Sequence, residues 1–86
     1  MPSQSKSVAY IQSLISEHKL ALSPGILLIG EGLPWKVFEH EDRYLGIDTN
    51  GVVWIGSYRE KWDRLGECTL SVALLAVRFL VTGSQL

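Results

Sequence analysis

The stretch GIDTNGVVWIGS, residues Gly46–Ser57, decides the fold because its turn determines which side chains face the core. Alternating apolar residues flank Asn50-Gly51, a dipeptide typical of tight hairpin turns, so the stretch reads as a β-hairpin. Apolar side chains fall on what should be both of its faces, whereas an antiparallel hairpin normally turns one face to water. The direction of Trp54 is therefore the first question.

Two turns are compatible with this hairpin, and they give different registers. With Asn50-Gly51 as a two-residue type I′ turn, Ile47 opposes Trp54 and both faces of the hairpin are mixed. We therefore weigh this register against a three-residue loop that contains a β-bulge.

In the bulged register, Thr49–Gly51 forms the loop with Gly51 in the left-handed region, and Asp48 opposes Val52. Gly46 then opposes Trp54, whose indole covers the gap that glycine leaves in a strand. The faces separate, and one of them carries an uninterrupted apolar set: Leu45, Ile47, Val53 and Ile55. We favour this register, which sends Trp54 away from the core.

Upstream of this hairpin the same period of two continues, with short connections that predict an antiparallel meander. The expected strands are Ile26–Gly30, Trp35–His40, Arg43–Asp48 and Val52–Ser57. A Glu41-Asp42 turn sets Phe38 opposite Leu45, so Phe38 joins the core face. The opposite face collects Trp35, Val37, Glu39, Tyr44, Asp48, Val52 and Trp54 around a depression at Gly46 and Gly56.

Helical patterns lie on either side of the predicted sheet. An amphipathic helix is expected from about Ser7 to Leu20, ended by the segment that contains Pro24 and Gly25. A second helix is expected to have Thr69 as its N-cap and to run to about Thr82, followed by Gly83 as the C-terminal cap. We interpret Tyr58–Glu67, which alternates in charge, as a short turn or one to two helical turns.

The predicted fold is therefore α+β, in the order helix, four-stranded antiparallel meander, helix, with both helices on one sheet face. Residues 1–86 form a single domain, in which residues 1–6 are expected to be a flexible N-terminal arm. The second helix is apolar around most of its circumference, which is more than one sheet face and one helix can cover. We expect another surface to bury the remainder.

Composition argues against several classes of function. The 86 residues contain 8 Lys+Arg and 9 Asp+Glu, so the net charge of −1 offers no basic surface for nucleic acid or anionic lipid. The longest apolar run contains Arg78 and is too short to span a bilayer. One cysteine, Cys68, forms no internal disulfide and suits a reducing compartment. We expect a cytoplasmic protein with no cofactor.

Candidate chemical groups are few. The titratable cluster at Glu39–Asp42 lies in a turn, where water has free access and side chains diverge. His18 is expected at the edge of the core, hydrogen-bonded to backbone, and Cys68 as a small buried thiol without a base partner. We predict neither a catalytic nor a metal site at these positions.

Two further patterns have ordinary explanations. GILLIGEG, residues 25–32, lacks the Lys and Ser/Thr of a phosphate-binding loop and leads into a strand. Tyr58 and Trp62 interleave with basic residues as in a nucleic-acid surface, but Glu60 and Asp63 offset the charge.

The aromatic face leads to the functional hypothesis. Either the segment 58–67 or the N-terminal arm folds over it as a lid, or it is an interface, because Trp and Tyr commonly anchor interfaces. We predict a small non-enzymatic protein-interaction module that forms a homodimer and binds another protein through this face or the second helix. The candidate residues are Trp35, Val37, Tyr44, Val52, Trp54 and Leu75.

The alternative is a small-molecule binding domain with a hollow beside Trp35, Tyr44 and Trp54. A minimal enzyme that uses Glu39, His40 or Asp42 is the third hypothesis.

Overall fold

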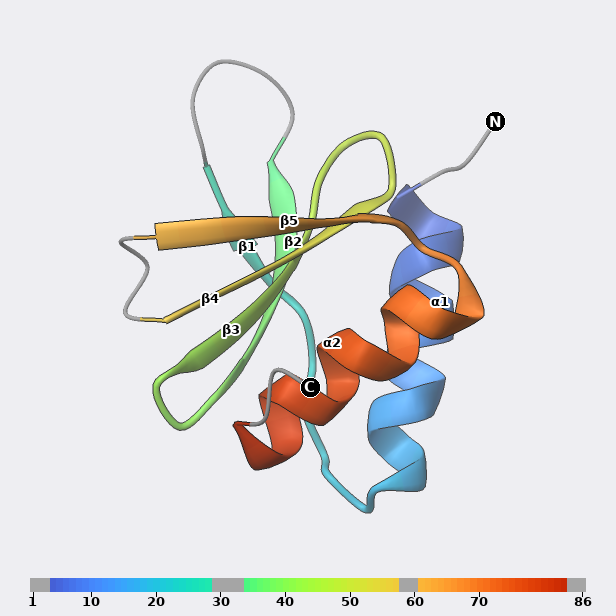
Figure 1. Cartoon of the computed structure of the whole chain (residues 1–86), viewed down its shortest axis with the longest axis vertical. Coiled ribbons are helices and arrows are strands. Elements are labelled where there is room, and N and C mark those ends of the chain that lie inside the picture. Colours follow the sequence, from blue (N-terminus) through green and yellow to red (C-terminus); the bar gives the residue numbers. More distant parts are fainter. Residues whose placement is uncertain (1–3, 29–33, 58–60, 84–86) are drawn as a thin grey trace.

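The computed structural model describes residues 4–28, 34–57 and 61–83. The elements follow in the order α1 (Gln4–Glu17), β1 (Gly25–Leu27), β2 (Trp35–His40), β3 (Arg43–Ile47), β4 (Val52–Ser57), β5 (Lys61–Glu67) and α2 (Leu70–Thr82). The strands form one antiparallel sheet in the order β1-β2-β3-β4-β5. Both helices lie on the same side of this sheet (Figure 1). The predicted α+β meander between two helices is confirmed, with one more strand than expected.

The β3–β4 hairpin has the bulged register. Gly46 pairs with Trp54, and the amide of Asp48 donates to the carbonyl oxygen of Val52 at 3.0 Å. Gly51 has a φ of 84°, the left-handed conformation that glycine adopts without strain. The Asp48 carboxylate accepts from the amides of Asn50 and Val52, which holds the turn together.

The core lies between the sheet and the two helices, as the register requires. The sheet contributes Phe38, Leu45, Ile47, Val53 and Ile55, α1 contributes Ile11 and Ile15, and α2 contributes Ala73, Ala76, Val77, Phe79 and Leu80. Each of the five predicted sheet positions is at most 4 % exposed. The predicted core face is thus confirmed.

The bounds of α1 differ from the expected Ser7–Leu20 at both ends. The helix begins at Gln4, whose side-chain amide donates to the carbonyl oxygens of Pro34 and Ile47 and so holds the first turn against the sheet. It ends at Glu17, before the segment containing Pro24 and Gly25. Lys19 adopts a φ of 61°, and the amides of Lys19 and Leu20 bond back to Ser16 and Ile15, a Schellman motif that ends the helix.

Three strand predictions also need correction. The first strand is Gly25–Leu27 instead of Ile26–Gly30, whose last residues lie outside the described part of the chain. β3 ends at Ile47, because Asp48 already belongs to the turn. Residues 61–67 form strand β5 instead of a turn or helix, while residues 58–60 lie outside the described ranges.

A β-bulge interrupts the alternation of β5, so a period of two does not identify this strand in the sequence. Val53 pairs with Gly66 whereas its neighbour Trp54 pairs with Arg64, so Leu65 is an extra residue. Trp62 and Arg64 share the outer face and Leu65 packs against the core, as alternation requires, and the extra residue then moves Glu67 to the outer face, opposite Val52. The period of two is therefore broken in the middle of the strand.

The termini of α2 are as predicted. The hydroxyl of Thr69 accepts from the amide of Val72, and Gly83 has a φ of 81° with its amide bonded to Phe79. The guanidinium of Arg43 adds a tertiary cap, because it donates to the carbonyl oxygens of Leu80 and Val81. These bonds tie the β2–β3 hairpin to the C-terminal end of α2.

Candidate interaction surface

Three indoles gather on the side of the sheet opposite the helices. Trp35 of β2 lies with its ring centroid 5.1 Å from that of Trp54 of β4 and 5.5 Å from that of Trp62 of β5. The Trp35–Trp62 pair is edge-to-face, a geometry that aromatic rings favour. All three residues are partly buried, and we call this cluster the tryptophan surface.

Trp62 occupies the depression expected at Gly46 and Gly56. A Cβ on Gly46 would lie 2.9 Å from Cζ3 of Trp62 and 3.2 Å from Cε3 of Trp35. A Cβ on Gly56 would lie 3.3 Å from Cε3 of Trp62. The glycines thus let the ring lie flat on the sheet, and the hollow that the small-molecule alternative uses is filled by a side chain of the protein itself.

The structure brings together five of the six residues predicted for the interaction surface. Trp35, Val37, Tyr44, Val52 and Trp54 share the outer face of the sheet. Val37 and Tyr44 are 9 % and 8 % exposed, and the ring centroid of Tyr44 lies 6.3 Å from that of Trp62. Leu75 lies apart from them, on α2, which packs on the other side of the sheet (Figure 1).

Carboxylates fix the polar atoms of this face. Nε1 of Trp54 donates to Oδ2 of Asp48 at 3.1 Å, which orients the indole. The hydroxyl of Tyr44 donates to Oε2 of Glu39 at 3.3 Å. Glu67 pairs with Val52 on the same face, and Arg64 pairs with Trp54. Among the described residues, three acidic side chains and one basic side chain thus surround the indoles.

Trp62 belongs to this surface although the sequence did not predict it, since its ring contacts Trp35 and lies over Gly46. The charged neighbours of Trp62 made its segment look solvated, and the bulge at Leu65 hid the alternation. A usable signal was present, because Gly46 and Gly56 fall on the same sheet face, where an aromatic side chain of a neighbouring strand can cover glycines. Of the segment expected as a lid, residues 61–67 form the adjacent strand β5 and do not fold back over the sheet. Only the Trp62 ring of this strand covers part of the face.

The titratable cluster of the β2–β3 turn forms no convergent site. Glu39, Glu41 and Asp42 are exposed, and Glu41 forms an ion pair with Arg43 at 3.2 Å. Within the described ranges, no group of three or more His, Cys, Asp or Glu residues is arranged to hold a metal ion. His18 is exposed beyond the end of α1, so its expected place at the core edge is wrong.

Cys68 is partly buried at the junction between β5 and α2. Burial raises the pKa of its thiol because a thiolate is poorly solvated there, and a hydrogen bond with Ser7 opposes this shift. A raised pKa lowers the thiolate fraction near neutral pH, which is the reverse of what activates a nucleophilic cysteine.

The apolar surplus of α2 is smaller than the sequence suggests. Packing against the sheet and α1 buries Ala73, Ala76, Val77, Phe79 and Leu80, which leaves Leu70 and Leu74 exposed and Leu75 partly so. No helix in the described ranges is both long and apolar enough to cross a membrane.

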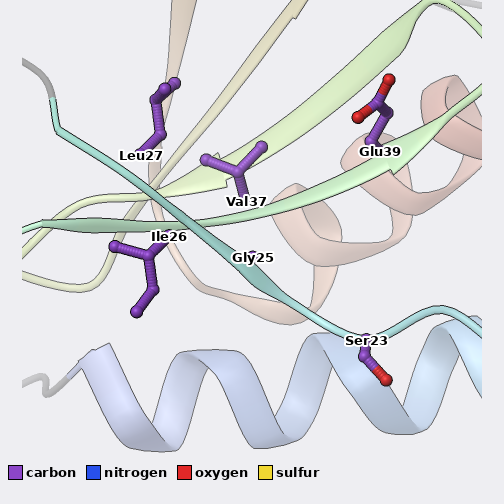
Figure 2. Close-up of a pocket in the computed structure, with 6 residues that line it drawn as sticks. All are labelled: Ser23, Gly25, Ile26, Leu27, Val37 and Glu39. Carbon is purple, nitrogen blue, oxygen red and sulfur yellow. The ribbon is translucent and has the colours of Figure 1, made fainter.

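A separate hollow of about 200 Å³ lies at the β1 edge of the sheet. It is lined by Ser23, Gly25, Ile26, Leu27, Val37 and Glu39. Figure 2 shows Leu27, Val37 and Glu39 pointing to one side of the strands and Ile26 pointing to the other side, toward α1. The absence of a side chain at Gly25 leaves this part of the edge open.

Comparisons with protein-family models, curated proteins and solved structures gave no match for this chain.

Proposed function

We propose that the protein is a non-enzymatic protein-interaction module and that another protein docks on the tryptophan surface. The supporting observation is the contiguous cluster of Trp35, Trp54 and Trp62 on the outer face of the sheet. Both helices pack on the opposite face (Figure 1). Tryptophan contributes strongly at interfaces because its large rigid ring buries much apolar area and loses little conformational entropy.

The charges around the indoles indicate the chemistry of the partner. Among the described residues, Glu39, Asp48 and Glu67 share the outer face with one cation, Arg64, so the side chains of this part of the face carry more negative than positive charge. A partner that presents apolar side chains flanked by Lys or Arg matches this pattern. The apolar contacts would provide most of the affinity, and the charges would provide orientation and association rate.

A selection from a phage-displayed random peptide library tests the proposal. The wild-type protein is the bait, and enriched peptides are synthesised and their affinity measured by fluorescence polarisation. We expect peptides that combine apolar and basic residues, with binding weakened at least tenfold by Trp54→Lys and several-fold by Glu67→Lys. The second substitution alters an exposed side chain and leaves the indole packing intact.

Leu74→Lys is the matched control, because it places the same charge on an exposed apolar position of α2. This variant should bind the peptides like the wild type. No enrichment, or equal affinity for the wild type and Trp54→Lys, would overturn the proposal, provided that the amide NMR spectrum of the variant shows a folded chain. A small ligand that co-purifies in native mass spectrometry and is lost in Trp54→Lys would instead favour the small-molecule alternative.

A further inference from the structure

The two edges of the sheet, β1 and β5, are protected to very different degrees. β5 bears Lys61, Asp63, Arg64 and Glu67 and contains a β-bulge, features that discourage the addition of another strand. The segment Ser23–Leu28 contains no charged residue. It presents Ile26, 65 % exposed, and Leu28, 74 % exposed. The short β1 strand and Pro24 limit any added pairing to a few residues, but the β1 edge carries no charge that would repel an added strand.

We propose that a second copy of this chain adds to β1 as an antiparallel strand, with a two-fold axis at Ile26. The two sheets would then be continuous, with all four helices on one side. This inference does not rest on the proposed function, because pairing at β1 needs no partner on the tryptophan surface, although the two regions adjoin at Val37 and Glu39. It assigns the homodimer to a place that is neither the aromatic face nor α2.

This symmetry fixes the register of the new strand pair. Ile26 lies opposite Ile26 of the second copy, because a two-fold axis pairs the central residue with itself. Gly25 lies opposite Leu27 of the second copy, and Pro24 lies opposite Leu28 of the second copy. Pro24 lacks an amide proton and so ends the hydrogen-bonded ladder.

On the outer face, this register places Leu27 of the second copy opposite Gly25, which has no side chain. The hollow of about 200 Å³ beside Gly25 is flanked by Val37 and Glu39, which point to the same side as Leu27 (Figure 2). Directly opposite strand residues have their Cβ atoms about 5 Å apart. Leu27 of the second copy would therefore reach the hollow that Gly25 leaves, and the symmetry repeats the contact.

On the helix side, the same register pairs the exposed leucine with a groove. A groove of about 370 Å³ runs between α1 and the edge of the sheet. Its lining consists of Gln4, Ser5, Val8, Ala9, Gln12, Pro24 and Lys36. Leu28 of the second copy falls opposite Pro24, at the side of this groove, while the two Ile26 side chains cover each other.

A second copy fits this edge because one short strand carries both the gaps and the side chains that match them. Self-pairing of Ser23–Leu28 also brings no like charges together, since the segment is uncharged. The contact is short, so we expect a dimer that dissociates on dilution, as small interfaces do. Sedimentation equilibrium over a range of concentrations measures this directly.

The first test compares Ile26→Glu with Leu74→Glu, which places the same charge on an exposed apolar residue of α2. Ile26 pairs with Lys36 of its own sheet, so a carboxylate there is tolerated in the folded chain, whereas two copies would bring two carboxylates together. We expect dimers for the wild type and Leu74→Glu at several hundred micromolar, and a monomer for Ile26→Glu. A wild type that stays monomeric, an Ile26→Glu variant that still dimerises, or a Leu74→Glu variant that becomes monomeric would each overturn the proposal.

Disulfide trapping tests the register in a Cys68→Ser background. With copper-phenanthroline as oxidant, two thiols of Ile26→Cys should form an intermolecular disulfide, because the two-fold axis brings their Cβ atoms within reach. Leu28→Cys is the matched control, since each of its thiols lies opposite Pro24. Efficient dimer formation by Ile26→Cys and at least tenfold less by Leu28→Cys is expected on a non-reducing gel. The reverse order, or equal trapping, would contradict the register.

Discussion

The indole of Trp62 lies across Gly46, although β4 separates their two strands. A Cβ on Gly46 would stand 2.9 Å from Cζ3 of Trp62, closer than carbon atoms approach without displacement. The glycine is therefore a requirement of the tryptophan surface, because any larger residue would lift the ring from the sheet.

Gly46→Ala tests this contact. The added methyl group should displace Trp62 and Trp35 and lower the free energy of unfolding by about 1 to 3 kcal/mol, as overpacking does. Denaturant unfolding followed by far-UV circular dichroism gives the value. Gly25→Ala is the control, because its Cβ would lie 3.7 Å from the nearest atom, the Val37 carbonyl oxygen. Equal stability of the Gly46→Ala variant and the wild type would show that Trp62 does not cover Gly46.

Gly56→Ala should be more damaging than Gly46→Ala. Its Cβ would lie 2.5 Å from the carbonyl oxygen of Lys61, and a backbone atom can move only if the β4–β5 pairing shifts. We expect a loss of roughly 3 kcal/mol or more, or a chain that does not fold at 37 °C. Thermal unfolding of the two variants side by side establishes the order, and a smaller loss in Gly56→Ala would argue against the pairing of β4 with β5.

Arg43→Met tests the bond between the hairpin and α2. The substitution keeps much of the apolar stem but removes the donors to the carbonyl oxygens of Leu80 and Val81, at 3.1 Å each. Because the site is partly exposed, we expect a loss of about 1 to 2 kcal/mol. Hydrogen exchange should accelerate in the last turn of α2. Arg78→Met, at an exposed position of the same helix, should change neither quantity appreciably.

Much of this arrangement can be predicted because local sequence determines it. Asp48 and Gly51 define the bulged turn, and that turn determines which of Ile47 and Trp54 faces the core. Likewise, Thr69 and Gly83 mark the ends of α2 through their capping chemistry. In each case a few neighbouring residues determine the local structure, since the hydrogen bonds of the turn and of the two caps join residues less than about five positions apart.

The errors lie where distant contacts or an irregularity decide the outcome. α1 begins at Gln4 because of bonds to Pro34 and Ile47, which are remote in sequence. Lys19 ends the helix in a left-handed conformation that is unusual for a side-chain-bearing residue. The bulge at Leu65 conceals β5 and with it Trp62, so the outer face could be predicted only in part.

The alkylation rate of Cys68 should depend on pH in a way that reveals its burial. Because burial raises the pKa of the thiol, reaction with iodoacetamide at pH 8 should be slower in the folded chain than in urea. Favouring the neutral thiol stabilises the fold below about pH 9, and this contribution is lost as the pH rises through the folded pKa. Ser7→Ala removes the opposing hydrogen bond and should slow the reaction further. Faster alkylation in the folded chain than in urea would contradict the raised pKa.

The register of β3 and β4 places Trp54 on the face away from the helices, where β5 adds Trp62. A nuclear Overhauser spectrum of isotope-labelled protein tests this placement. The predicted result is contact between the α-protons of Gly46 and the ring protons of Trp62, with Gly46 shifted upfield and Ile47 paired with Val53. Pairing of Ile47 with Trp54, together with Gly46 free of indole contacts, would contradict this placement.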